Sequence, residues 1–184
     1  MKSVLLTGSA EREKDPMKRN TRIALVLCLA VLATASEARA DCRHVRGGIT
    51  ETVIPSPNDP FGRVLGNVNG VLNGASTAFI TSVNPLPSGV LHATSFDVFV
   101  TNRGDMLTAT GAVTLTPVPG KPPGEFRANV TLTVTGGSGK YALPTGTITF
   151  EGQVHNFFGG PGVATSDVIY RGFVCAPNLK ADEN

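Results

Sequence analysis

The sequence predicts an all-β protein in which eight antiparallel strands follow one another and close into an up-and-down barrel. Three observations lead to this fold class. About eight segments alternate apolar and polar side chains, the pattern of a strand with one buried face. No segment after residue 40 has a 3.6-residue apolar period long enough for a packed helix. Two cysteines, Cys42 and Cys175, stand where the first strand begins and the last one ends.

The cysteine positions favour a barrel over a two-sheet sandwich, which the strand pattern also allows. In an even-stranded up-and-down barrel, closure makes the first and last strands neighbours. The start of one strand then lies beside the end of the other, within the ~7 Å between Cα atoms that a disulfide requires. An odd strand count would place the cysteines at opposite ends. We therefore expect a disulfide between Cys42 and Cys175 that closes the barrel, with the sandwich as the alternative.

Most of the expected strands are bounded by turn-forming Gly, Pro, Asn or Asp residues. In chain order the strands are Arg43–Val53, Arg63–Leu72, Thr77–Val83, Val90–Thr101, Leu107–Thr116, Phe126–Thr135, Thr147–His155 and Asp167–Cys175. Asn102-Arg103-Gly104-Asp105 is a typical hairpin turn. The stretch Val130–Gly152 indicates a strand, a glycine-rich corner and a returning strand. The barrel domain is expected to span residues 41–176, followed by a polar tail over 177–184.

Four glycines lie on the strand faces that also carry the valines and leucines of the expected core. They are Gly66, Gly70, Gly111 and Gly152. Glycine leaves volume that a close-packed interior would otherwise fill, so we expect these positions to border a cavity. Gly66, Gly111 and Phe99 are the candidate ligand-binding residues.

The N-terminal region predicts export. Residues 17–40 combine a basic start, an apolar run over Ile23–Ala35 and the small-x-small sequence Ala38-Arg39-Ala40, the pattern of a cleaved signal peptide. The apolar run is too short to span a bilayer of ~30 Å, although an uncleaved anchor or a buried helix is the alternative. Residues 1–16 are expected to be an upstream extension that results from a wrongly assigned start. We expect a periplasmic or extracellular protein with no membrane span after cleavage.

The charge balance of the mature chain excludes one class of partner. Beyond residue 40 the chain carries nine Lys or Arg and ten Asp or Glu residues. The basic balance of the full sequence therefore belongs to the leader. A nearly neutral chain lacks the electrostatic footprint of a protein that binds nucleic acid.

Three segments resemble a known group of barrels. The corner GGSGKYALPTGTITFEG resembles the GGTGKYAGATG-type corner of the allene oxide cyclase barrel-like superfamily, which also contains the plant dirigent proteins. Arg103–Leu107 and Tyr170–Cys175 resemble segments of small exported bacterial members. The resemblance covers most of the mature chain, but its motifs are glycine and turn positions, so it implies an eight-stranded barrel more strongly than any activity. Leu143-Pro144-Thr145 departs from the small residues usual in the group.

The familiar catalytic and metal-binding motifs are not found. Gly139-Lys140 lacks the glycine spacing and the following Ser or Thr of a phosphate-binding loop. His44, His92 and His155 lie on separate strands without metal-ligand spacing, and no GxSxG motif is present. We therefore expect neither a metal site nor a cofactor.

Two charged strand residues are the candidate catalytic pair. Asp97 shares a face with Leu91, Ala93 and Phe99, so in a barrel it becomes a buried carboxylate that needs a partner. Arg171 is the expected partner. A carboxyl group in an apolar pocket can serve as a general acid, although a structural ion pair or a solvent-facing charge is the alternative interpretation.

Three hypotheses for the function follow. The first is a non-catalytic exported barrel that binds a small apolar molecule, since an eight-stranded barrel is wide enough for one. The second is a dirigent-like or allene oxide cyclase-like isomerase or cyclase that steers a bound substrate. The third is a solid barrel with a structural or surface-interaction role. An apolar cavity with a paired carboxylate favours the enzyme, a purely apolar cavity favours the binder, and a filled interior favours the third.

Overall fold

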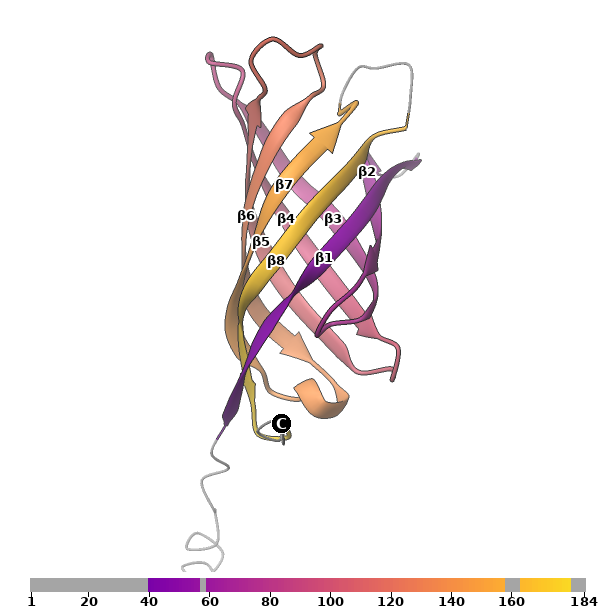
Figure 1. The fold of residues 1–184 in the computed structure, drawn as a ribbon, viewed down its shortest axis with the longest axis vertical. Helices are drawn as coiled ribbons and strands as arrows, with labels where there is room; N and C mark the ends of the chain where they lie inside the picture. The colour runs from indigo at the N-terminus through magenta and orange to yellow at the C-terminus, as the bar shows by residue number, and fades with distance from the viewer. Residues whose placement is uncertain (1–39, 57–58, 158–162, 180–184) are drawn as a thin grey trace, which may run out of the picture. The chain divides into compact units, whose positions relative to one another are not determined.

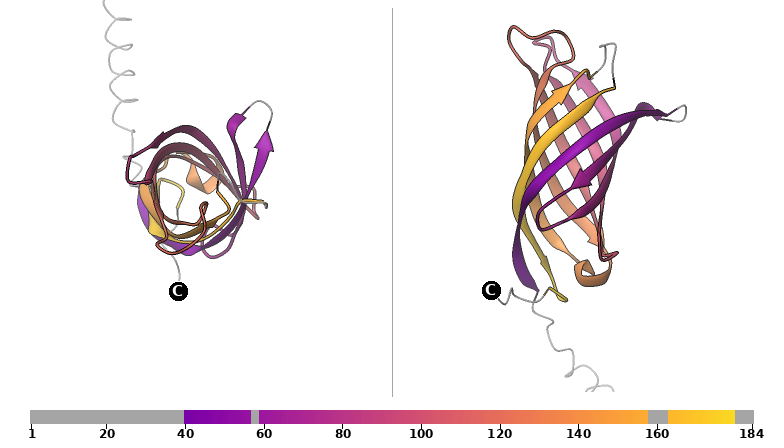
Figure 2. Two further views of the ribbon diagram at one scale, coloured as in Figure 1. Left: turned by 90° about the horizontal axis from the view of Figure 1, so that it is seen from above. Right: turned by 45° about the vertical axis from the view of Figure 1, so that its right-hand side comes forward.

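Eight strands form a closed antiparallel barrel in the computed structural model, which describes residues 40–56, 59–157 and 163–179 (Figure 1). The strands are β1 (Asp41–Ser56), β2 (Asp59–Val68), β3 (Gly74–Pro85), β4 (Leu91–Thr101), β5 (Met106–Pro117), β6 (Phe126–Gly137), β7 (Thr145–His155) and β8 (Thr165–Ala176). Each strand pairs with the next, and β8 pairs with β1, so the ring has no free edge strand (Figure 2). The predicted fold class and strand order are confirmed.

Several expectations concern residues outside the described ranges. The upstream extension and the signal peptide up to residue 39 lie there, as do residues 180–184 of the tail. Within the described ranges, no helix has the length and apolar character needed to cross a membrane.

Alternation of side chains places one face of every strand in the core. In β6, Phe126, Ala128, Leu132 and Val134 are buried, whereas the threonines between them face outward. In β3 the pairing register with β4 shifts between Ile80 and Ser82. The extra residue at this bulge reverses the alternation of inward and outward side chains along the strand. Both Ile80 and Val83 therefore pack against the core. A strict period of two would have placed one of them outside.

The disulfide joins the first and last strands, as the barrel argument predicted. Cys42 stands directly opposite Cys175 in the β1–β8 register, with 3.9 Å between their Cα atoms. We call this end of the barrel, where β1 begins and β8 ends, the disulfide end. The other end, where β1 ends and β8 begins, is called the mouth.

The interior of the disulfide end is filled by side chains. Leu72, Tyr141 and Leu179 are all buried there. The Tyr170 hydroxyl accepts a hydrogen bond from the Leu72 N–H (2.9 Å) and donates one to the Asn69 carbonyl (2.8 Å), which fixes the turn after β2. Two expectations are corrected here. The second strand ends at Val68 rather than Leu72, because the chain turns at residues 69–73, and Leu179 of the expected polar tail is part of the core.

The glycine-rich corner contains a short 3₁₀ helix, η1 (Gly139–Tyr141), before β7 begins. Gly139 has φ of 64°, a conformation that glycine adopts without strain. The Lys140 N–H donates a hydrogen bond to Asp105 Oδ1 (3.0 Å), which ties the corner to the β4–β5 turn. The corner therefore delivers Tyr141 into the core and leaves Lys140 at the surface.

At the mouth, the ends of β1 and β2 swing away from the ring (Figure 2). Only Arg63–Val68 of β2 pairs with β3, along Gly74–Phe79. The mouth is consequently less tightly closed on this side than the disulfide end.

Candidate functional site

A cavity of about 110 Å³ lies inside the barrel between its middle and the mouth. All eight strands contribute side chains to its wall. The wall is mainly apolar and includes Phe99, Val113, Leu132, Phe150, Phe157 and Val168. Stacked contact between Phe99 and Phe150, with ring centroids 6.2 Å apart, stiffens one side. The interior is therefore hollow toward the mouth and filled toward the disulfide end.

Two carboxyl groups face this apolar cavity. Asp97 Oδ2 accepts a hydrogen bond from Ser95 Oγ (2.6 Å), and Glu51 Oε2 accepts one from Ser166 Oγ (2.5 Å). All four side chains line the cavity, and none of its lining residues is Lys, Arg or His. Each carboxyl group thus has a hydroxyl partner but no cation of the described residues against it.

This environment favours the protonated forms of both acids. The pKa of Asp97 is raised to about 7, mainly by burial; the Ser95 hydrogen bond lowers it and the nearby charge of Glu51 raises it by smaller amounts. Burial also raises the pKa of Glu51, although the Ser166 hydrogen bond counteracts this shift. Near neutral pH the Asp97 carboxyl group is therefore close to half protonated, and it can donate as well as accept a hydrogen bond.

The strand pattern explains how the two acids come together. Asp97 alternates with Ser95 and Phe99 on the inner face of β4, as expected from the sequence. Glu51 alternates in the same way with Ile49 and Val53 on β1. Glu51 was not expected from the sequence, although a carboxylate between two core positions of one strand face was the available signal. Neither Ser95 nor Ser166 was identified.

The expected partnership between Asp97 and Arg171 is wrong. Arg171 lies on the outer face of β8, where its Nη2 contacts Glu151 Oε1 at 2.8 Å and both side chains are exposed. The inner face of β8 carries Val168, Tyr170 and Val174, so alternation directs residue 171 outward.

The glycines expected to border the cavity are instead packed against other atoms of the protein. A Cβ atom on Gly111 would collide with Ser95 Oγ and approach Leu132 Cδ2 to 2.9 Å. One on Gly66 would collide with Ser76 Oγ and lie 3.0 Å from Glu51 Cγ. The space beside both glycines is thus already occupied, and neither lines the cavity. Phe99, the third candidate, does line it.

The two remaining glycines are also closely surrounded. A Cβ on Gly152 would meet the backbone of Asp167 and Val168 on the adjacent strand. Gly70, with φ of 87°, lies in the turn after β2 at the disulfide end rather than beside the cavity.

Gly111→Leu should therefore destabilise the barrel, although the barrel is hollow nearby. The new side chain must displace Ser95 and Leu132, and overpacking of this kind costs about 1–3 kcal/mol or more. The next residue of β5, Ala112, is exposed, so Ala112→Leu is the matched control and should change stability by no more than about 0.5 kcal/mol. Urea unfolding midpoints test the difference, and equal midpoints for the two variants would contradict the crowding around Gly111.

The histidines are placed apart from the cavity acids. His44 and His92 are exposed, and His155 Nδ1 lies 2.7 Å from Glu125 Oε2 near the mouth. That hydrogen bond lowers the pKa of Glu125. Within the described ranges, no three His, Cys, Asp or Glu side chains are grouped so that they could hold a metal ion.

Comparisons with known proteins give little information beyond this geometry. No protein-family model matches the chain, and no curated protein matches it by sequence. Among solved structures, that of a pterocarpan synthase dirigent protein matches with a TM-score of 0.30 and 13% sequence identity. The match covers 74% of this chain and 91% of that chain.

Proposed function

We propose that this protein is an exported barrel that binds a small, mainly apolar molecule carrying one polar group, which meets Asp97 and Glu51. The observation that carries the proposal is the apolar cavity with two carboxyl groups and no cation in its lining. A buried acid without a charged partner gains most from a ligand that completes its hydrogen bonds. The apolar wall accounts for the remainder of the affinity.

The size of the cavity restricts the ligand. At about 110 Å³ it is comparable with apolar cavities of ~150 Å³ that take up benzene in other proteins. A single ring with a hydroxyl, carbonyl or amino group is therefore the class that we propose. Any larger part of the ligand would extend past Phe157 toward the mouth.

Two features support export. The disulfide between Cys42 and Cys175 is typical of an oxidising compartment such as the periplasm or the extracellular medium. Residues 17–40 have the composition of a signal peptide.

A second candidate function is acid catalysis on the bound molecule, as in an isomerase or cyclase. It is favoured by the pKa of Asp97, which at about 7 suits proton donation near neutral pH. In this reading, Asp97 gives its proton to an oxygen of the substrate while the cavity wall fixes the substrate's conformation and excludes water. Arg171 has no part in it, because it lies outside the barrel. The third hypothesis, a solid barrel, loses support because the interior contains a cavity.

Matched aromatic probes test the proposed binding. We expect benzyl alcohol and benzylamine to bind more tightly than toluene, which has a similar shape but no polar group. Calorimetric titration measures the three affinities. The preference should weaken in Asp97→Val, which replaces one of the two carboxyl groups by an apolar side chain of similar size, and all binding should disappear in Ala93→Phe, which fills the cavity. Failure of all three probes to bind the native protein would refute the proposal.

A further inference from the structure

Each of the two cavity acids keeps one carboxyl oxygen open to the cavity. Ser95 and Ser166 donate hydrogen bonds to Asp97 Oδ2 and Glu51 Oε2. Asp97 Oδ1 and Glu51 Oε1 have no hydrogen-bond partner among the described residues, and neither oxygen is fully covered by protein atoms. Both side chains line the apolar cavity. Acceptors in such a place gain most from a ligand that brings hydrogen-bond donors.

Glu51 is the one titratable group that faces Asp97 from another strand in the described part of the barrel. Apart from the two acids and the two serine hydroxyls, the eight strands contribute only apolar side chains to the cavity wall. The charge of Glu51 acts on Asp97 and raises its pKa. The two carboxylates are therefore close enough to repel each other, and one cation between them would remove this repulsion.

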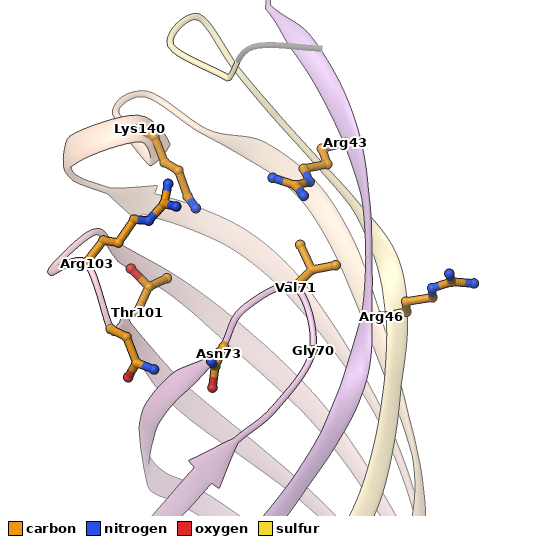
Figure 3. Close-up of a pocket in the computed structure, with 9 residues that line it drawn as sticks. Arg43, Arg46, Gly70, Val71, Asn73, Thr101, Arg103 and Lys140 are labelled. Atoms are coloured by element: carbon orange, nitrogen blue, oxygen red, sulfur yellow. The ribbon is translucent and has the colours of Figure 1, made fainter. Parts of the chain in front are cut away.

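Basic side chains gather elsewhere in the described barrel. Figure 3 shows Arg103 and Lys140 beside the turn of Gly70, at the disulfide end. His155, near the mouth, has its hydrogen bond with Glu125 rather than with a cavity acid. The pKa values of both cavity acids are raised, as expected where no cation is close. The described residues thus give these acids no positive charge, and a ligand can supply it.

We infer that the cavity binds its aromatic ligand as a monocation, with a primary ammonium group between Asp97 and Glu51. This inference rests on the proposed function and specifies the polar group of the ligand. An ammonium group has three N–H donors. The two open carboxyl oxygens can accept two of them, and a serine hydroxyl oxygen can accept the third. Hydrogen bonds between charged groups are roughly twice as strong as neutral ones, so the cavity should prefer an ammonium group to a hydroxyl group.

Binding of the cation should depend on pH through the two acids. An aliphatic ammonium group like that of lysine stays charged up to about pH 10, so between pH 5 and pH 8 the ligand itself does not titrate. At pH 5 Asp97, whose pKa is about 7, is protonated and attracts the cation weakly. At pH 8 it is ionised, and the affinity for the cation should be higher. Near neutral pH the bound cation should displace a proton from the pair of acids.

Calorimetric titration of the full chain with benzylamine and with benzyl alcohol tests the inference. At pH 8 we expect benzylamine, which is a cation at this pH, to bind at least about tenfold more tightly than benzyl alcohol. The affinity for benzylamine should fall by about tenfold or more at pH 5, while that for benzyl alcohol should change much less. Titrations at pH 7 in buffers of different ionisation enthalpy should detect proton release for benzylamine alone.

The double variant Glu51→Gln/Asp97→Asn replaces both acids by neutral amides of nearly the same shape. It should bind the two probes with about equal affinity and lose the pH dependence. Glu151→Gln removes a carboxylate from an exposed position of β7, and as the matched control it should keep the native preference. An unchanged circular dichroism spectrum and continued binding of benzyl alcohol show that the double variant is folded. The pH comparison in the native protein requires no variant, so it tests the inference even if the double variant does not fold.

The outcomes separate this inference from the proposed function. If toluene and benzyl alcohol bind but benzylamine binds no more tightly than benzyl alcohol at pH 8, the inference is overturned and the proposed function stands. If none of the probes binds, both are overturned. A preference for benzylamine that persists in the double variant would also overturn the inference, because the charge would then be recognised outside the cavity.

Discussion

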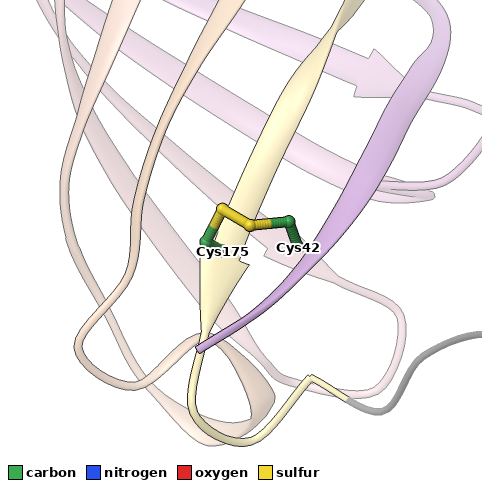
Figure 4. The surroundings of a disulfide bond; sticks show 2 residues. All are labelled: Cys42 and Cys175. Atoms are coloured by element: carbon green, nitrogen blue, oxygen red, sulfur yellow. A yellow bond between two sulfur atoms is a disulfide. The ribbon is translucent and has the colours of Figure 1, made fainter. Parts of the chain in front are cut away.

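Replacing both cysteines, Cys42→Ser with Cys175→Ser, should lower the stability of the barrel by about 4–5 kcal/mol, or roughly 10–20 °C in Tm. The bond closes a loop with a sequence separation of 133, and a loop of this length restricts the unfolded chain strongly. In the folded state the two strands remain paired by the backbone along Asp41–Thr52 and Thr165–Ala176. The bond lies across this seam (Figure 4). Strand content measured by circular dichroism should therefore stay nearly constant below the transition.

The double substitution avoids leaving a free thiol, which could form mixed disulfides. A reductant added to the native protein is the matched control and should produce the same loss of Tm, while the double variant should not respond to it. Unchanged stability after substitution would mean that the disulfide does not restrict the unfolded chain. It would contradict the stabilising role that we assign to this bond. Free thiols at both positions in non-reducing peptide mapping would contradict the bond itself.

Asp97→Asn should make the barrel more stable at alkaline pH, by up to about 4 kcal/mol relative to the native protein. The folded pKa of Asp97, about 7, lies above the 3.8 that is usual for an aspartic acid side chain. The folded state therefore binds the proton more tightly, and the native protein loses stability as the pH rises from about 4 to about 7. Above pH 7 the loss of stability is complete. A difference of about three between the folded and the unfolded pKa of Asp97 corresponds to about 4 kcal/mol of unfolding free energy. The amide cannot ionise, so the variant escapes this loss while it keeps a hydrogen bond with Ser95.

Urea midpoints at pH 5 and at pH 8.5 measure this effect. The native protein should be less stable at the higher pH, and Asp97→Asn should reduce the difference. Asp167→Asn, at an exposed position of β8, is the control and should leave the difference unchanged. A pH dependence identical in the native protein and Asp97→Asn would show that Asp97 does not carry a buried proton.

The fold could be predicted because the information for it is local. The alternation of apolar and polar side chains in strands such as Phe126–Gly137 indicates which face packs in the core. The turn residues indicate where each strand ends. The position of Cys42 opposite Cys175 followed from the even number of strands. The bulge in β3 could not be predicted, because its extra residue depends on pairing with β4.

The candidate site was predicted less completely, for physical reasons. Asp97 could be placed inside from its own strand, but its neighbours depend on the register between distant strands. Arg171 was assigned to the interior for its charge, although alternation with Tyr170 pointed the other way. The glycines do not border the cavity as expected, because a missing side chain does not specify whether a ligand or the protein itself occupies the space. At Gly111 the Ser95 hydroxyl takes it.

The filled disulfide end and the hollow mouth are expected to differ in the sequence changes that they tolerate during evolution. An insertion near Tyr141 or Leu72 would displace a buried side chain and weaken the fold. The turns at the mouth include exposed residues such as Gly120, around which a new side chain would meet nothing within 4 Å. Lengthening such a turn costs only a slowly growing loop-closure entropy. If the cavity binds the ligand that we propose, the choice of ligand can therefore diversify along one rim of this barrel while the other rim preserves the capacity to fold.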